Sequence, residues 1–302
     1  MQDQKKLLLG AHMSIEGGLD KAIERGTQVG CTTLQIFTKS NRQWHAKAIT
    51  SEEIEKFKQA VAASGINPIV AHASYLINLA SPEVATRKKS ITALKKELET
   101  CEQLNIPYLV LHPGSHVNQT TKEGIVLINQ GLNDVLKEVP GTTMITLETM
   151  AGQGSSVGST FEELAEIYQL SEYKKRLGFC LDTCHIFAAG YNFSNQKEYE
   201  ALWSKFDKIL GLKNLKVIHL NDSKKELGCR VDRHEGIGKG KIGKEGFSLL
   251  CNDRRFFDIP KILETPKTTL DEDIYNIKAV KELLSVETKT LLKVKSEKAH
   301  KS

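Results

Sequence analysis

The six cysteines of this chain form no pattern that is typical of a disulfide framework or a zinc finger. No two of them make the CxxC pair that such sites commonly use. The nearest pair, Cys180 and Cys184, flanks Asp182 at a spacing that is not a standard ligand pattern. These absences exclude a small disulfide-stapled scaffold, and we expect a protein of a reducing compartment.

Long apolar runs are also absent, and none approaches the length of a membrane-spanning helix. The first residues, MQDQKKLLLGAH, hold an apolar segment that is too short for a signal peptide. We therefore expect a soluble, cytoplasmic protein that has no membrane partner.

The chain lacks a strong excess of either charge, because 42 lysines and arginines are set against 37 acidic residues and the net charge is +5. A balance this mildly basic permits an anionic partner without requiring one. No Pro/Gly linker or shift in composition divides the sequence. We predict one domain over residues 1–286, followed by a Lys-rich, flexible tail over residues 287–302.

What the sequence does contain is a regular alternation of two kinds of segment. Between the apolar runs lie segments of helical periodicity; Ile54, Phe57 and Val61, for example, form one stripe behind a capping box of Thr50 and Glu53. The runs themselves suit parallel strands that are buried on both faces. Eight strands alternating with helices predict a single-domain (β/α)8 TIM barrel, and an open doubly wound sheet is the alternative. The eight runs are 7–11, 34–37, 68–71, 108–111, 144–147, 178–181, 215–218 and 259–263.

A polar side chain stands at or just past the end of each predicted strand. In a (β/α)8 barrel these strand ends meet at one rim, where side chains from different strands share a site. Seven of the eight residues at these positions have side chains that can bind a metal, and the threonine is the exception. The eight are His12, Thr38, His72, His112, Glu148, Asp182, His219 and Glu264.

Two further pairs of ionisable residues follow strands. Asp182 and His185 form one pair. Asp232 and His234 form the other, and because they are two residues apart, both can point the same way from an extended segment. Imidazole and carboxylate are ordinary zinc ligands, and several converging carboxylates indicate more than one ion. A Gly-rich stretch at 236–241 is basic and could contact phosphate, but it lacks the GxxxxGKS or GxxxxGKT pattern of a P-loop.

The polar residues at the strand ends belong to longer sequence motifs. The motifs are GAHMSIEGGL (10–19), FTKSNRQW (37–44), HASYLINLA (72–80), HPGSH (112–116), LDTCHIFAAGY (181–191), HLNDSK (219–224), RVDRHEGIGKGKIG (230–243) and ILET (262–265). Together they resemble the motifs of the endonuclease IV family of apurinic/apyrimidinic DNA-repair nucleases. The resemblance extends from residue 8 to residue 286 and leaves only the two ends outside.

This resemblance implies a barrel that holds three zinc ions per chain at its rim, bound by nine ligands. All nine positions carry the expected residue type. Glu148, as a bridging ligand, and Glu264, beside the attacking water, are the implied catalytic residues, and the identity of the general base stays open. The three groups are His72, His112 and Glu148; Glu148 again with Asp182, His219 and Glu264; and His185, Asp232 and His234.

The resemblance also implies the substrate and the reaction. A monomer would cut double-stranded DNA on the 5′ side of an abasic site and leave a 3′-hydroxyl and a 5′-deoxyribose phosphate, as a step of base excision repair. Trimming of blocked 3′ ends is expected as a second activity. Arg42, Tyr75 and Leu76 would enter the DNA at the lesion, where apolar wedges can unstack bases.

Two other functions are compatible with metals at a barrel rim. A sugar isomerase or epimerase typically needs fewer ligands, so the group of His185, Asp232 and His234 would be surplus in such an enzyme. A non-catalytic DNA-binding or zinc-buffering protein would retain damaged DNA without cutting it.

Overall fold

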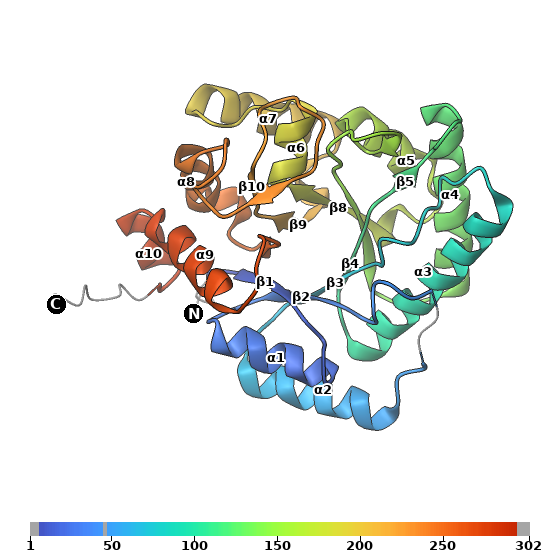
Figure 1. Cartoon of the computed structure of the whole chain (residues 1–302), viewed down its shortest axis with the longest axis horizontal. Helices are drawn as coiled ribbons and strands as arrows, with labels where there is room; N and C mark the ends of the chain where they lie inside the picture. The colour runs from blue at the N-terminus through green and yellow to red at the C-terminus, as the bar shows by residue number, and fades with distance from the viewer. Residues whose placement is uncertain (1–5, 45–46, 295–302) are drawn as a thin grey trace.

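The computed structural model describes residues 6–44 and 47–294, and this part of the chain contains a closed barrel of eight parallel strands. Around the barrel the strands follow the order β1-β12-β9-β8-β6-β4-β3-β2, with helices outside them (Figure 1). The closed barrel confirms the (β/α)8 prediction and excludes the open doubly wound sheet. The strands are β1 (Leu9–Met13), β2 (Leu34–Phe37), β3 (Ile69–His72), β4 (Tyr108–Leu111), β6 (Met144–Glu148), β8 (Leu177–Asp182), β9 (Leu215–His219) and β12 (Lys261–Leu263).

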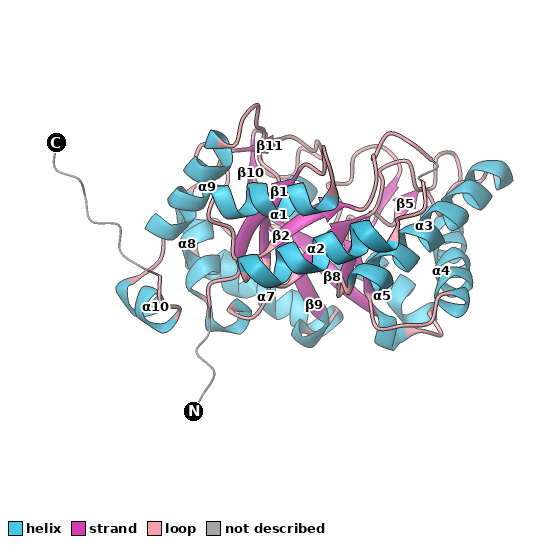
Figure 2. Ribbon diagram, turned by 90° about the horizontal axis from the view of Figure 1, so that it is seen from below, coloured by secondary structure: helices cyan, strands magenta, loops and turns pink. Residues whose placement is uncertain are grey.

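The helices cover the outside of the barrel, and two short two-stranded sheets lie at one end of it. Figure 2 shows β5, β10 and β11 on the same, upper side of the barrel. These small antiparallel sheets pair β5 (Gly114–Ser115) with β7 (Ser156–Val157), and β10 (Asp222–Ser223) with β11 (His234–Glu235). The helices are α1 (Leu19–Gln28), α2 (Ser51–Ser64), α3 (Val84–Leu104), α4 (Thr121–Glu138), α5 (Phe161–Leu170), α6 (Thr183–Ala189), α7 (Gln196–Ile209), α8 (Lys244–Asn252), α9 (Asp271–Glu282) and α10 (Val286–Leu291), with 3-10 turns η1 (Lys174–Arg176), η2 (Leu212–Asn214) and η3 (Arg254–Phe256).

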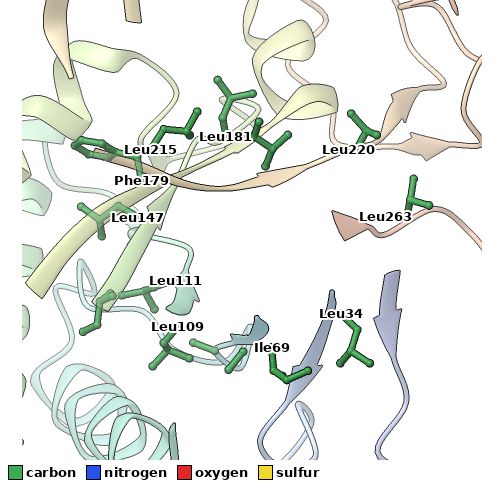
Figure 3. Close-up of a cluster of buried hydrophobic side chains, with 14 of the residues drawn as sticks. Leu34, Ile69, Leu109, Leu111, Leu147, Phe179, Leu181, Leu215, Leu220 and Leu263 are labelled. Carbon is green, nitrogen blue, oxygen red and sulfur yellow. The ribbon is translucent and has the colours of Figure 1, made fainter. Parts of the chain in front are cut away.

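Successive residues of each strand face opposite sides of the barrel wall. On the inside, Val70, Val110, Cys180, Val217 and Ile262 form a small apolar cluster of their own. We call this cluster the inner layer. Because the inner layer fills the barrel, polar inner side chains gather beyond it, at the rim. A larger core holds the other buried apolar residues, and Figure 3 labels Leu34, Ile69, Leu109, Leu111, Leu147, Phe179, Leu181, Leu215, Leu220 and Leu263 among them.

Two helices begin at threonine caps, and the sequence analysis indicates the first of them. At α2, Thr50 accepts a hydrogen bond from the N–H of Glu53, and the Glu53 carboxylate accepts one from the N–H of Thr50, so the capping box is complete. At α5, Thr160 likewise accepts from the N–H of Glu163. The Glu163 carboxylate, however, accepts from the N–H of Gly158 and so holds the preceding loop instead of completing a box.

The last described segment of the chain is helical. Helix α10 begins at Val286, the last residue of the predicted domain, and continues into the segment that we predicted to be a flexible tail; the side chains of Thr288 and Leu292 are buried. Residues 295–302 lie outside the described residues, and the domain boundary at residue 286 stays a prediction. Over the described ranges, no helix combines the length and the apolar character that a membrane span requires.

Lys261 is an unusual strand residue because its charged side chain is buried. It is the first residue of β12, at the end of the barrel opposite to the rim, and it is 1% exposed. Its ammonium donates to the carbonyl oxygens of Phe256 at 2.6 Å and Ile259 at 3.2 Å. Burial nevertheless lowers the pKa of Lys261 to about 8, because the protonated form is poorly solvated there.

This lowered pKa predicts that stability depends on pH. The charged Lys261 destabilises the folded state fully below pH 8, and the effect disappears as pH rises from about 8 to the ordinary pKa of 10.5. The free energy of unfolding of the wild type, relative to that of Lys261→Met, should therefore rise by about 3 kcal/mol over this range. Denaturant unfolding at a series of pH values measures the difference. The control is Lys213→Met, which replaces an exposed lysine. If the difference in free energy of unfolding between the wild type and Lys261→Met does not change with pH, the prediction is wrong.

Candidate metal centre

The candidate ligands are the inner residues that follow the inner layer of the barrel. Side chains two residues apart on a strand point to the same face. The residues two positions after those of the inner layer are therefore inner residues as well, and they lie at the rim. They are His72, His112, Asp182, His219 and Glu264, and they are joined by Glu148 at the end of β6.

Glu148 lies at the centre of this cluster and is fully buried. Its Oε2 atom is 3.2 Å from Nε2 of His72 and 3.1 Å from Nε2 of His112. Its Oε1 atom is 2.9 Å from Nδ1 of His219. The two oxygens of one carboxylate thus face two different groups of histidines, which is the arrangement that a bridging ligand needs.

Asp182 and Glu264 complete the group around His219. The Nδ1 atom of His219 lies 3.0 Å from Oε2 of Glu264 and 3.8 Å from Oδ2 of Asp182. The ligand atoms of these residues and of Glu148 all lie within 4.8 Å of one another. Three carboxylates around one imidazole carry an excess of negative charge, which a cation among them would offset.

The third group comes from elements beyond the strands. His185 lies on α6, which follows β8 directly, and His234 begins β11. Asp232 joins the two histidines, because its Oδ2 is 3.2 Å from Nε2 of His185 and its Oδ1 is 3.2 Å from Nε2 of His234. The Asp232 side chain is 43% exposed, so this group lies at the solvent side of the centre.

Hydrogen bonds fix which nitrogen of four histidines faces the centre. In His219, Nε2 lies 2.8 Å from the amide oxygen of Gln35, and Nδ1 faces the carboxylates. In three others, Nδ1 lies near a backbone carbonyl oxygen, which accepts only; in the neutral ring Nδ1 therefore carries the hydrogen and Nε2 keeps a lone pair. These three contacts are His72 with Ala73 at 2.7 Å, His185 with Thr149 at 2.8 Å and His234 with Glu264 at 3.1 Å.

The charges of the centre shift several pKa values. Burial lowers the pKa of His219, but Cys180 and the carboxylates of Glu264 and Glu148 outweigh burial and hold this pKa well above its ordinary value. In the same way, Asp182 and Asp232 overcome burial and raise the pKa of His234 to about 9. The imidazoles therefore keep a positive charge against the carboxylates wherever no other cation balances them.

The donor set fits zinc. The Nε2 atoms of His185 and His234 are buried, and neither forms a hydrogen bond with a described residue, although both face the Asp232 carboxylate. Nitrogen and oxygen donors in groups of three or four are typical of zinc. Groups of side chains that could hold a metal ion coincide with the three groups that the sequence resemblance implies. That these residues bind zinc stays a prediction.

Two cysteines also lie within reach of these groups. Cys180 is close to Glu148 and His219, and Cys184 is close to Asp182 and His234. Burial raises the pKa of both thiols to about 12, which disfavours the thiolate that a metal would need. The oxygen and nitrogen donors are therefore the better ligands.

The residues that the resemblance places at the DNA lie on the loops after β2 and β3. The side chain of Tyr75 is 55% exposed, and its ring centroid is 5.2 Å from that of His72 and 5.3 Å from that of His112. Leu76 follows it and is half-buried, and Arg42 is exposed. The structure thus brings Tyr75 to the edge of the candidate centre, and contact of the three residues with DNA stays a prediction.

Comparison with known proteins identifies the family. Residues 23–285 match a family model described as a xylose isomerase-like TIM barrel. A protein named probable endonuclease 4 from Chloroflexus aggregans is 50% identical over 279 residues, which cover 92% of this chain and 98% of that protein. The chain belongs to the endonuclease IV family.

Other relatives agree with the membership in the endonuclease IV family. Probable endonuclease 4 from Geobacter sulfurreducens is 47% identical, with 91% of this chain and 94% of that protein covered. The crystal structure of endonuclease IV from Thermus thermophilus matches with a TM-score of 0.80 and 36% identity, over 91% of this chain and 98% of that one. A D-tagatose 3-epimerase-like protein matches with a TM-score of 0.70 at 20% identity, over 91% and 96% of the two chains, and shares the fold alone.

Sequence reasoning on this endonuclease IV family member missed the residues that hold the ligands in place. Asn221 is buried; its amide nitrogen donates to Oδ2 of Asp182, and its amide oxygen accepts from the N–H of Glu264, both at 2.7 Å. Gln35 donates to Oε1 of Glu264 at 2.7 Å. His12, which the strand-end pattern singles out, is in none of the candidate metal groups of the described residues. A polar residue inside an apolar strand run was the available signal for Gln35.

The Gly-rich stretch at 236–241 packs against the side chain of Asp222, and this contact accounts for its glycine content. The buried carboxylate of Asp222 accepts hydrogen bonds from the N–H groups of Gly238, Gly240 and Ile242. A Cβ atom at position 240 would lie 2.5 Å from this carboxylate, so the close approach requires glycine. The stretch is therefore a rim loop that is folded around an internal carboxylate.

A buried ion pair holds the loops that carry Arg42 and Tyr75. Nζ of Lys39 lies 3.1 Å from Oε1 of Glu97 on α3, and the two side chains are 8% and 2% exposed. Oε2 of Glu97 accepts from the N–H of Ser74, and Lys39 also donates to the carbonyl oxygen of Gln43. One ion pair therefore connects both loops to the same helix.

We predict that Glu97→Gln lowers the free energy of unfolding by about 3 to 5 kcal/mol, because it leaves the ammonium of Lys39 buried without a counter-ion. Denaturant unfolding measures the loss. The matched control is Glu99→Gln on the same helix, which removes a surface ion pair with Lys96 and should cost less than about 1 kcal/mol. Equal losses in the two variants would contradict the importance of the buried pair.

Proposed function

We propose that this chain is a zinc-dependent apurinic/apyrimidinic endonuclease of base excision repair. It hydrolyses the phosphodiester on the 5′ side of an abasic site in double-stranded DNA and leaves a 3′-hydroxyl and a 5′-deoxyribose phosphate. It also trims blocked 3′ ends, where the same hydrolysis takes place at a terminal position. The enzyme acts as a cytoplasmic monomer with three zinc ions per chain.

The observation that carries this proposal is the division of the rim donors into three groups of the composition that zinc prefers. The group of His185, Asp232 and His234 exceeds what an isomerase of the same fold needs. A phosphodiester is an anion, and a site with this many cation-binding donors suits it. The 50% identity with a protein named probable endonuclease 4 supports the same assignment.

Three groups of residues would hold the proposed zinc ions, and Glu148 belongs to two of these groups. Glu148 would bridge two of the ions, and the contacts of its two oxygens with different histidines support this role. When bound, the zinc ions lower the pKa of a coordinated water towards about 7 and neutralise charge on the phosphate. The ligand sets are His72, His112 and Glu148; Glu148, Asp182, His219 and Glu264; and His185, Asp232 and His234.

Glu264 is the carboxylate that we propose to act beside the attacking water. Its side chain is 12% exposed, whereas that of Glu148 is 1% exposed, so Glu264 is the one that reaches the opening of the site. A carboxylate there accepts a hydrogen bond from the water and orients it. In the net reaction phosphorus gains the hydroxyl of the water, its bond to the 3′ oxygen breaks, and that oxygen takes the remaining proton.

The DNA-contacting residues are proposed to recognise the lesion by stacking and not by reading bases. The half-exposed ring of Tyr75 lies next to the ring of His112, at the edge of the centre. With Leu76 and Arg42 it can fill the space that the missing base leaves, and the abasic nucleotide then turns towards the ligands. A nucleotide without a base loses little stacking when it is extruded, which favours abasic sites over intact ones.

An incision assay on an abasic duplex tests the proposed function. The purified protein should contain three zinc ions per chain and cut one strand at the lesion, and removal of zinc by a chelator should abolish cutting until zinc is restored. His112→Ala and Glu264→Gln should reduce incision to background while circular dichroism shows an intact fold. One or two divalent ions together with turnover of a keto sugar would instead support an isomerase, and retention without cutting would support a binding protein.

Binding experiments test the role of Tyr75. Tyr75→Ala should weaken binding of abasic duplex by about 10- to 100-fold, since stacking on an aromatic ring is lost, and should leave binding of intact duplex nearly unchanged. Fluorescence anisotropy with both duplexes gives the ratio. Tyr275→Ala, which removes another exposed tyrosine, should leave the ratio as it is in the wild type. Equal losses on both duplexes in Tyr75→Ala would exclude a wedge at the lesion.

A further inference from the structure

Gln35 is a fully buried amide in the middle of β2, between two apolar neighbours. Parallel pairing aligns it with His12 on β1 and with Val70 of the inner layer on β3, so its side chain occupies an inner position of the barrel. An amide is costly to bury unless its donor and acceptor atoms are satisfied. The contacts of Gln35 therefore indicate what the residue is for.

The amide makes three polar contacts at the floor of the candidate centre. Its Nε2 donates to Oε1 of Glu264 at 2.7 Å, and lies 3.0 Å from Nδ1 of His12. Its Oε1 lies 2.8 Å from Nε2 of His219. Both hydrogens of the amide nitrogen and one lone pair of the oxygen are thus used.

The orientation of this amide follows from its partners. A carboxylate accepts hydrogen bonds only, so the nitrogen of Gln35 must face Glu264 and the oxygen must face His219. The amide oxygen also only accepts, so Nε2 of His219 must carry a hydrogen. In the neutral ring, the lone pair is then on Nδ1, which points to the carboxylates of Glu148 and Glu264.

His219 differs in this respect from the other histidines whose tautomer is fixed. Those rings donate to backbone carbonyl oxygens, which no substitution removes, and they turn Nε2 to the centre. His219 turns Nδ1 to the centre, and its partner is a side chain. The tautomer of this one ligand is therefore set by the identity of a single residue.

We propose that Gln35 is a positioning residue that fixes the tautomer of His219 and the orientation of Glu264 for the zinc ion between them. This inference rests on the proposed function, because it concerns the second of the three proposed zinc positions. Partners that hold metal-ligating histidines typically change metal affinity or activity by about 10- to 100-fold when they are replaced. Gln35 is inaccessible to solvent and so to DNA.

The test compares Gln35→Met, which has a similar volume but cannot form these hydrogen bonds, with the wild type. Equilibrium dialysis against buffered free zinc should show that one of the three ions is bound about 10- to 100-fold more weakly in Gln35→Met. At limiting zinc, kcat for an abasic duplex should fall by a similar factor while KM for DNA stays unchanged. The control is Asn129→Leu, which removes a buried amide of α4 that donates to the carbonyl oxygen of Ile167 and not to a candidate ligand; this variant should keep all three ions.

A second measurement does not depend on how well the variant folds. In zinc-loaded wild type labelled with nitrogen-15 histidine, NMR should find His219 with its hydrogen on Nε2, opposite to His72, His185 and His234. A hydrogen on Nδ1 of His219 would overturn the proposal. So would wild-type zinc affinity in Gln35→Met together with a loss of stability equal to that of Asn129→Leu, since Gln35 would then be structural only. Failure of the wild type to bind three zinc ions or to incise would instead refute the proposed function.

Discussion

Buried charge is the constraint on which the rest of this structure depends. Glu148, Asp182 and His219 are inaccessible to solvent, and ionised groups are unstable in such a place unless other charges and hydrogen bonds balance them. The fold balances them by setting carboxylates against imidazoles and by satisfying the remaining polar atoms with the amides of Gln35 and Asn221. The same contacts therefore form the candidate metal centre and hold the side chains of the barrel rim in place.

Buried carboxylates also hold the loops around the centre in place. Glu97 holds the loops of Arg42 and Tyr75, and Asp222 holds the Gly-rich loop at 236–241. Asp222 accepts hydrogen bonds from the backbone N–H groups of its loop, whereas Glu97 accepts one from Ser74 and reaches the loop of Arg42 through the ammonium of Lys39. Rigid supports of this kind matter because a site performs its chemistry only when its groups keep their relative positions.

The barrel by itself does not determine the reaction. A D-tagatose 3-epimerase-like protein has the same fold, with a TM-score of 0.70, at only 20% identity. In this chain two features stand at the rim beside the strand-end ligands: the group of His185, Asp232 and His234, and the exposed ring of Tyr75 beside His112. Function on this fold follows from the side chains at the rim.

The sequence by itself determined the eight strands, because each strand is a local apolar run. It also placed six candidate ligands at strand ends, whereas the grouping of His185 with Asp232 and His234 came from the resemblance to the endonuclease IV family. The period of two between Val70 and His72, or between Val217 and His219, is already present in the sequence. Tertiary structure alone decided how these groups are supported. Gln35 meets His219 and Glu264 across 184 and 229 residues of sequence, and only the register of a closed barrel brings them together. Tertiary structure also decided which ring nitrogen of His185, His219 and His234 faces the centre. The other nitrogen of each ring meets a hydrogen-bond partner from a distant part of the chain.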